Sequence, residues 1–375
     1  MKVTDVKTAI VRGNFNWLLV RVETDEGLNG LGECWGEAGV KDLIRSKVRP
    51  LLMGEDPMDI GRLFLKVMRN PPTPAGAQVT AWSGVEMALW DIAGKKLEAP
   101  IYRLLGGGKY RDRVRVYADS HAGKDYAPES YAERALEVKA RGFGAIKFDV
   151  DHLTPYQRLD YHNLGLSNAE ARHIVSVVAA VREAIGDDVD LAIDAHWSYN
   201  VADAVKVAKR LEPYNLMWFE DPVPYDNPET VAKVSASTST PICVGEHLFT
   251  RHGFRELIVR QAVAVIAPDM ANSGGLLECK KIADMAETYT INMAPHNICS
   301  PVATLAAAHA CAAIPNFLAL EFHSQDVPWW DDLVTGIEKP IIKDGFIRVP
   351  ERPGLGVELN EEVARKHLAE GEQLF

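Results

Sequence analysis

The chain has 375 residues, 47% hydrophobic and 25% charged, which is typical of a globular protein long enough for two domains. Its net charge of −11 and its scattered Lys and Arg residues argue against a nucleic-acid-binding surface. The five cysteines lack paired short spacings, and we find neither a signal peptide nor an apolar run of membrane-spanning length. We therefore expect a cytoplasmic protein with reduced thiols, without nucleic-acid or membrane partners.

Residues 1–110 predict an α+β domain. Alternating apolar residues indicate three strands, at 3–11, at 17–23 and from Leu31 onward. Helical patterns follow, at 40–52, 60–68 and 81–97. Because the strands precede the helices without alternation, this segment is predicted to be a module of its own. The Gly106-Gly107-Gly108 run that follows lacks the Lys-Ser/Thr of a phosphate loop, and we interpret it as a linker.

Strands and helices alternate after this linker. The predicted strands lie at 114–118, 144–148, 263–267, 291–294 and 317–320, and three more end at Asp194, Glu220 and Glu246. Helical segments separate them, which gives eight strands and seven helices. Consecutive units of this length favour a (β/α)7β TIM barrel, with a doubly wound open sheet as the alternative. A hairpin at 341–349 and a short helix at 360–370 are predicted to end the chain.

Three of these strands end in a carboxylate at a constant spacing of 26 residues, at Asp194, Glu220 and Glu246. Parallel strands point their carboxyl ends to one side, so the three acids should converge. Converging carboxylates repel each other unless a cation lies between them, and an all-oxygen set suits Mg²⁺. The alternative is that each acid only caps the next helix. The common phase of all three favours the metal site.

Every strand from the second to the eighth ends in an ionisable residue. Besides the three acids, these residues are Lys147, Asp149, His196, Asp269, His296 and Glu321. Residues i and i+2 share a face of a strand, so Lys147 pairs with Asp149 and Asp194 with His196. A single His or Lys is usually a solvated side chain. The coincidence over seven strand ends instead predicts a site.

These residue types suit the removal of a proton next to a carboxylate. Mg²⁺ would acidify the α-proton of a small-molecule carboxylate, and His296, oriented by Asp269, would accept that proton as the base. His196 would protonate a leaving β-hydroxyl. Lys147 would place positive charge beside the substrate carboxylate, and Glu321 would hydrogen-bond the enediolate oxygen.

Motifs across nearly the whole chain carry a family resemblance. They are Gly32-Glu33, the helix at 88–95, Leu104-Leu105-Gly106-Gly107, Glu220-Asp221-Pro222, Gly245-Glu246, Pro268-Asp269, Gly274-Gly275, Ala294-Pro295-His296 and Pro353-Gly354-Leu355-Gly356. With them the chain resembles the mandelate racemase subgroup of the enolase superfamily. The resemblance implies Mg²⁺ ligands at Asp194, Glu220 and Glu246 and a base dyad of His296 and Asp269. It also implies a capping domain (1–110), a barrel (111–325) and a C-terminal segment (326–375) that packs back on the cap.

Details at two strand ends narrow the reaction. Racemases of the family carry Lys-x-Lys where this chain has Lys147-Phe148-Asp149, so two-base racemisation would lack a partner. Asp194-Ala195-His196 resembles the galactonate and gluconate dehydratases. The implied reaction is loss of water from C2 and C3 of an aldonate, which gives a 2-keto-3-deoxy sugar acid. The alternatives are an epimerase, racemase or cycloisomerase that uses the same enediolate, and a relative that has lost turnover.

The capping loops of the family correspond to residues 12–17 and 35–39, where specificity should lie. The substrate contacts that we expect are Arg12, Asn14, Trp17, Trp35, Asp149 and His247. The irregular insert at 151–165 is as consistent with a plain surface loop as with a lid. We further expect a homo-oligomer.

Overall fold

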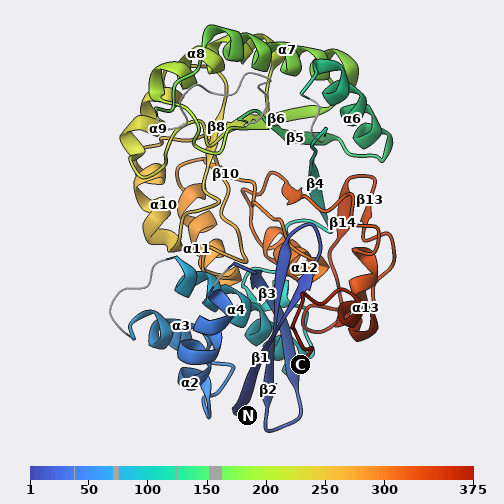
Figure 1. Ribbon diagram of the computed structural model, residues 1–375. Helices are drawn as coiled ribbons and strands as arrows, with labels where there is room; N and C mark the ends of the chain where they lie inside the picture. Colours follow the sequence, from blue (N-terminus) through green and yellow to red (C-terminus); the bar gives the residue numbers. More distant parts are fainter. Residues whose placement is uncertain (38, 71–75, 123–125, 152–162) are drawn as a thin grey trace.

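The computed structural model describes residues 1–37, 39–70, 76–122, 126–151 and 163–375. Figure 1 shows a small N-terminal domain against one end of a barrel, with the C-terminal segment running down the side from the barrel to the small domain. Both termini lie at the small-domain end (Figure 1). The predicted insert at 151–165 falls largely on residues 152–162, which lie outside the described residues. No helix within the described ranges is both long and apolar enough to cross a membrane.

The small domain, hereafter the cap, opens with an antiparallel sheet of three strands in the order β1 (Val3–Arg12), β2 (Asn16–Thr24), β3 (Asn29–Trp35). Helices follow, namely α1 (Val40–Leu43), α2 (Arg49–Leu52), α3 (Ile60–Met68), α4 (Ala77–Lys96) and α5 (Ile101–Leu104). Helix α4 begins four residues before its predicted start at 81, and α5 was not predicted. A π-helical turn over Ile44–Val48 joins α1 to α2, so the helix predicted at 40–52 is one run in three pieces. The cap is therefore the α+β module that the sequence predicts.

Helix α4 lies between the cap sheet and the barrel. It is buried on nearly every side, from Val79 to Gly94, because strand β3 packs along it. This packing needs glycine in the strand. A Cβ atom at Gly30 or Gly32 would stand within 2.1 Å of a backbone oxygen of α4. Helix α4 is thus an internal element shared by the two domains.

Two buried carboxylates of the cap hold helices of the barrel. Glu33 accepts hydrogen bonds from Ser300 N (2.9 Å), Ser300 Oγ (2.5 Å) and Ala303 N (3.0 Å), at the start of α12 (Pro301–Ala312). Glu86 accepts from Leu276 N (2.8 Å) and Leu277 N at the start of α11 (Leu276–Glu287). The first turns of a helix have unpaired N–H groups and a positive dipole end, so carboxylates stabilise both helices there. These contacts fix the cap over the barrel.

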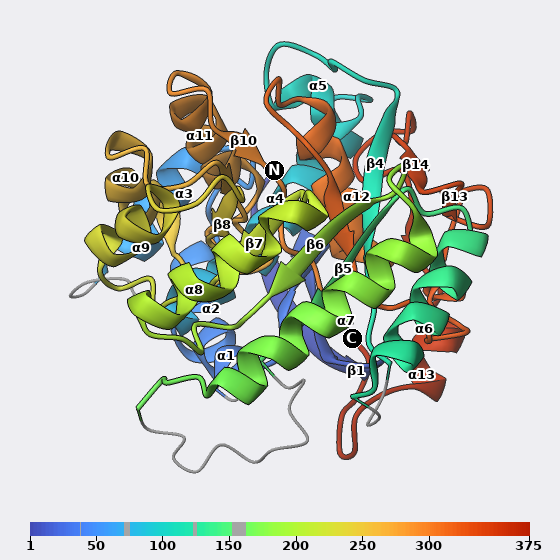
Figure 2. The same cartoon turned by 90° about the horizontal axis from the view of Figure 1, so that it is seen from above.

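The barrel strands are parallel and follow the chain order. They are β4 (Arg113–Asp119), β5 (Ala145–Asp149), β6 (Asp190–Asp194), β7 (Trp218–Glu220), β8 (Ile242–Val244), β9 (Val265–Ile266), β10 (Asn292–Met293) and β11 (Leu320–Phe322). Strand β11 pairs with β4, and a bridge from Met293 to Phe317 links β10 to the segment before β11, so the sheet closes. The remaining helices, α6 (Pro128–Ala140), α7 (Asn168–Ile185), α8 (Val201–Leu211), α9 (Pro228–Ser235) and α10 (Thr250–Val259), surround it with α11 and α12 (Figure 2).

This architecture confirms the predicted modified (β/α)7β barrel with its N-terminal α+β cap. The last strand lies later than predicted, at Leu320–Phe322 rather than 317–320, because the ladder with β4 begins only at Leu320. The doubly wound open sheet is excluded by the closure of β11 on β4.

The C-terminal segment contacts both domains. Strands β13 (Ile342–Lys343) and β14 (Phe346–Arg348) form the predicted hairpin, and β14 pairs antiparallel with β4 of the barrel. Strand β12 (Val334–Thr335) pairs with β15 (Glu358–Leu359), and α13 (Glu361–Lys366) follows. Beyond α13, Leu368 bridges to Val11 of the cap sheet. The segment thus completes the cap and also extends the barrel sheet.

Candidate active site

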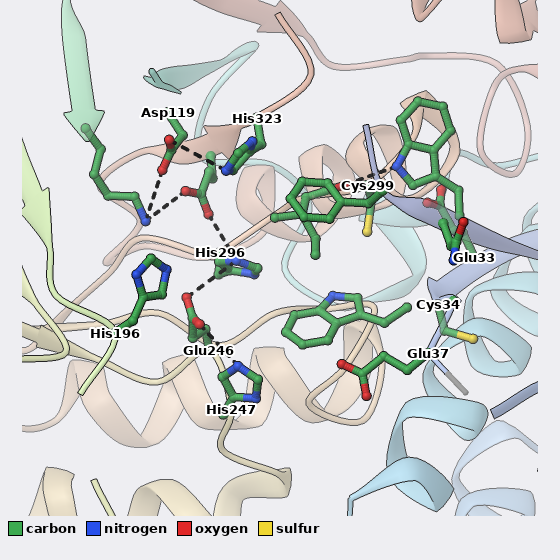
Figure 3. A pocket seen from close by; sticks show the side chains of 18 of the residues that line it. Glu33, Cys34, Glu37, Asp119, His196, Glu246, His247, His296, Cys299 and His323 are labelled. Atoms are coloured by element: carbon green, nitrogen blue, oxygen red, sulfur yellow. Dashed lines mark hydrogen bonds and ion pairs between the residues drawn. The ribbon is translucent and has the colours of Figure 1, made fainter. Parts of the chain in front are cut away.

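A cavity of about 740 Å³ lies where the carboxyl ends of the barrel strands face the cap. Cap and barrel both contribute to its wall. Its wall includes Phe15, Trp17, Trp35, Asp119, Lys147, His196, Trp197, Glu246, His247, His296, Glu321 and His323. Figure 3 shows several imidazoles and carboxylates pointing into this space from the barrel side.

Asp194, Glu220 and Glu246 come together at the ends of β6, β7 and β8. One oxygen of each lies within 4.8 Å of the other two, and all three side chains are buried. Trp218 Nε1 donates a 2.8 Å hydrogen bond to Glu220 Oε2, whereas the buried Glu220 Oε1 has no hydrogen-bond partner among the described residues. An unpaired buried oxygen beside two further carboxylates fits a hard divalent cation. The residues present therefore fit the Mg²⁺ that we expect.

Lys147 lies among the same carboxylates. Its Nζ is 3.0 Å from Asp194 Oδ2, 3.2 Å from Glu220 Oε2 and 2.9 Å from Glu321 Oε1. Although burial lowers the pKa of Lys147, the surrounding carboxylates, Glu220 foremost, raise it well above its ordinary value. Lys147 is therefore a fixed ammonium that balances the acids, and its placement beside the substrate carboxylate stays a prediction.

His296 and Asp269 form a hydrogen-bonded pair of 2.7 Å between Nδ1 and Oδ2. The same Asp269 oxygen accepts a 2.9 Å hydrogen bond from Trp35 Nε1, so a cap residue also touches the pair. The other ring nitrogen, Nε2, faces Glu246 at 3.5 Å and Glu321 at 3.7 Å. Burial lowers the pKa of His296, but the negative charges of Glu246, Glu321 and Asp269 together raise it to about 10.

His196 enters the cavity from a different side than His296, with Glu246 below them (Figure 3). His196 and Trp197 have φ angles of 41° and 59°, in the left-handed region that side chains rarely adopt. This bend lets His196 N bond back to Asp194 Oδ1 at 3.0 Å, and His196 Nδ1 lies 3.2 Å from Asp151 Oδ1. Burial lowers the pKa of His196, but the bond to Asp151 and the charge of Asp194 raise it to about 11. A protonated imidazole at this place suits a proton donor.

The expected substrate contacts divide into two groups. Trp17, Trp35 and His247 line the cavity, as we expect of substrate-binding residues. The other three, Arg12, Asn14 and Asp149, are absent from the described residues that line it.

Each residue of the second group has a local reason for its position. Asn14 Nδ2 donates to His323 O at 3.0 Å, and Arg12 lies at the end of β1, where its backbone N donates to His367 O. Asp149 faces His121 Nδ1 at 3.5 Å. Their placement supports roles beside the cavity rather than direct contact with a substrate.

Sequence reasoning missed Asp119 and did not predict that His323 lies beside it. Asp119 ends β4, so the first barrel strand also ends in an ionisable residue. The signal was present, because the acid directly follows the apolar run at 114–118, but the strand was predicted to end one residue too early. Asp119 Oδ2 lies 3.6 Å from Lys147 Nζ, and Asp119 Oδ1 lies 3.6 Å from His323 Nε2. His323 follows β11, so only the closure of the barrel brings it next to β4.

Curated relatives of this fold act on sugar acids, according to their names. The chain is 45% identical to a D-xylonate dehydratase of Haloferax volcanii over 379 aligned residues, covering 100% of this chain and 90% of that protein. It is 35% identical to a D-gluconate dehydratase of Thermoproteus tenax, covering 95% and 71%. A D-galactonate dehydratase of Xanthomonas euvesicatoria is 32% identical, covering 98% and 94%.

Solved structures show the same fold over the full length. A mandelate racemase/muconate lactonizing enzyme-like protein from Rubrobacter xylanophilus superposes with a TM-score of 0.95 at 44% identity, covering 100% of this chain and 99% of that one. A mandelate racemase/muconate lactonizing enzyme from Jannaschia sp. gives a TM-score of 0.90 at 32% identity, covering 100% and 99%.

Two family descriptions together account for both domains. Residues 4–106 match the mandelate racemase / muconate lactonizing enzyme N-terminal domain, and residues 130–363 match the enolase C-terminal domain-like family. The resemblance that the motifs indicated is confirmed, and the chain belongs to the mandelate racemase / muconate lactonizing enzyme family of the enolase superfamily.

Proposed function

We propose that this protein is a Mg²⁺-dependent hydro-lyase that dehydrates an aldonate to a 2-keto-3-deoxy sugar acid. The observation that carries the proposal is the placement of two histidines on different sides of one carboxylate cluster, each with its own carboxylate partner. His296 is bound to Asp269, as a general base requires, and His196 enters from another side in a setting that favours its charged form. The names of the relatives, which are dehydratases of three sugar acids, support the same reaction.

Each step is assigned to a side chain of this chain. His296 accepts the α-proton at Nε2, because Nδ1 is held by Asp269. His196 gives its proton to the 3-hydroxyl as the C–O bond breaks, so water leaves and the enol product tautomerises to the 2-keto acid. When bound by Asp194, Glu220 and Glu246, Mg²⁺ supplies positive charge that acidifies the α-proton and offsets the acids that raise the pKa of His296.

The carboxylate cage around Lys147 argues against epimerisation. A two-base reaction needs a second group that accepts and returns a proton from the opposite face. Lys147 is held in its charged form by three ion pairs with Asp194, Glu220 and Glu321, so it is a poor acceptor. The cycloisomerase alternative is not supported either, because the barrel side of the cavity is lined with charged groups and not with apolar ones.

Mass spectrometry separates these reactions. Purified protein with MgCl₂ is screened against aldonates and aldarates with an assay for 2-keto acids. The reaction of each substrate that gives a product is then repeated in D₂O. Dehydration gives a product lighter by the mass of one water, about 18 units. A product of unchanged mass, with solvent deuterium in recovered substrate, would overturn the proposal in favour of epimerisation. No turnover of any sugar acid would remove the substrate class.

A further inference from the structure

A second cluster of metal-ligating side chains lies beside the carboxylate trio. It consists of Asp119 at the end of β4, His121 two residues later, and His323 after β11, each offering one donor atom within 4.8 Å of the others. We propose that Asp119, His121 and His323 bind one zinc-class divalent cation, at a site distinct from the Mg²⁺ ligands. Two imidazole nitrogens and one carboxylate oxygen suit zinc or cobalt, whereas the trio offers only oxygens.

The distances within the cluster carry the proposal. His121 Nε2 is 3.3 Å and His323 Nε2 is 3.6 Å from the same oxygen, Asp119 Oδ1. Both distances are longer than the 2.7 Å of the hydrogen bond between His296 Nδ1 and Asp269 Oδ2. Ligands that share a tetrahedral ion with bonds of about 2.0–2.1 Å lie about 3.3–3.4 Å apart. The spacing thus resembles that of ligands around a common ion more than that of a hydrogen-bonded pair.

The shared oxygen is itself unsatisfied. Asp119 is buried to 4% exposure, and its Oδ1 has no hydrogen-bond partner within the part of the chain that the structure describes. Such a buried acceptor is costly to leave unpaired.

The carboxyl group of Asp149 stands behind one of the imidazoles. His121 Nδ1 lies 3.5 Å from Asp149 Oδ2, on the side of the ring away from Asp119. Metal-ligating histidines commonly direct their second nitrogen at a carboxylate, which orients the ring and makes it a better ligand. Asp149, which does not line the cavity, would thus orient the ring of His121.

Lys147 separates the two sites. Its ammonium stands 3.6 Å from Asp119 Oδ2 and 3.0 Å from Asp194 Oδ2, so the acid of each cluster faces it. Asp119 and His323 both line the cavity. A three-ligand site of this kind leaves a coordination position for water or for an oxygen of a bound molecule.

Cobalt titration tests the proposal without relying on turnover. Metal-free protein is saturated with MgCl₂ and then titrated with CoCl₂, while visible ligand-field absorption and bound cobalt per chain are recorded. We expect one Co²⁺ per chain that Mg²⁺ does not displace. His121→Asn and His323→Asn should each weaken it at least about 10-fold, and Asp149→Asn should weaken it about 10-fold.

Two control variants make the result decisive. His252→Asn removes an exposed imidazole on α10 and should leave the cobalt titration unchanged. Glu220→Gln should weaken the Mg²⁺ site and keep the cobalt site. Cobalt binding that disappears in Glu220→Gln but survives in His121→Asn and His323→Asn would overturn the proposal, as would the lack of any cobalt bound beside Mg²⁺. Because the readout is absorption, failure of the dehydratase reaction would not affect it.

Discussion

The barrel and the cap contribute different things to the same cavity. From the barrel come buried ionisable groups at the strand ends, held in place by ion pairs around Lys147 and by the His296–Asp269 hydrogen bond. From the cap come the aromatic rings of Phe15, Trp17 and Trp35, together with the carboxyl groups of Glu33 and Glu37. The groups that we propose to react thus belong to the barrel strands and the loops that follow them, and the cap shapes the space above them. Substitutions in the barrel and in the cap should therefore affect activity and stability differently.

The largest effect is expected from His296→Asn on the barrel side. Loss of the base should lower both α-proton exchange and dehydration by about 10²–10⁴-fold, since general base catalysis has this size. NMR of substrate recovered from D₂O measures α-proton exchange, and a 2-keto acid assay measures dehydration. Circular dichroism and binding of Mg²⁺ serve as controls for folding. Exchange at the wild-type rate would show that another residue is the base.

His196→Asn should separate the two steps. Elimination should fall by about 10²–10³-fold, within the range for a general acid, while α-proton exchange falls much less. The ratio of deuterium uptake to product formation measures this difference. Equal losses in both steps would remove His196 from the role of acid.

Glu220→Gln tests the metal. The amide replaces a charged ligand by a neutral one and should weaken Mg²⁺ by about 10–100-fold, measured by titration calorimetry and by the Mg²⁺ dependence of turnover. Treatment with EDTA should abolish turnover of the wild type, and added MgCl₂ should restore it. Turnover that persists in EDTA would contradict a metal-dependent reaction.

Trp35→Phe tests the hydrogen bond from the cap residue Trp35 to Asp269, the partner of His296. The variant keeps an aromatic ring but loses the 2.9 Å bond to Asp269, and we expect kcat to fall about 10-fold, because a bond to a charged group contributes roughly 1.5–3 kcal/mol. Trp90→Phe is the matched control, since it loses a bond to Glu86 away from the cavity. Equal effects of the two variants would mean that Trp35 only stabilises the cap.

The smallest effect concerns stability and pH. Burial raises the pKa of Glu33 to about 7, from 4.5, against the hydrogen bonds of Ser300 and Ala303. A carboxyl with a raised folded pKa contributes stability below its unfolded pKa and loses it as pH rises through the folded value. The free energy of unfolding of the wild type, relative to Glu33→Gln, should therefore decrease between about pH 4.5 and pH 7, by on the order of 1–3 kcal/mol. Parallel curves for the two proteins would contradict this.

How much could be predicted from sequence follows the same division. The strand-end acids Asp194, Glu220 and Glu246 were predictable, because strand periodicity and barrel closure place them together whatever the loops do. Asp119 was not predicted, because the first barrel strand was predicted to end one residue too early, at 118. His323 meets Asp119 only through the pairing of the last strand with the first, which no local pattern reveals.

The cap loops were the least predictable part. Arg12 and Asn14 were expected on the cavity wall, but Asn14 bonds to the backbone at His323, and Arg12 lies beside the C-terminal segment. Such contacts join residues more than 300 positions apart in the chain, and no periodicity encodes them. Trp17, Trp35 and His247 do lie on the wall, since large rings at a domain junction face the space between the domains, and their contact with a substrate stays a prediction.

The buried position of α4 has a consequence for anyone who wishes to redesign this enzyme. Helix α4 lies between the cap sheet and the barrel, and its Glu86 anchors the start of α11. Exchanging the whole N-terminal domain with that of a relative would therefore cut through a shared interior. Chimeras made that way should aggregate. Grafting only the turn around Gly13 and the stretch after Trp35 leaves that interior intact, and libraries for new sugar acids are best confined to those two places.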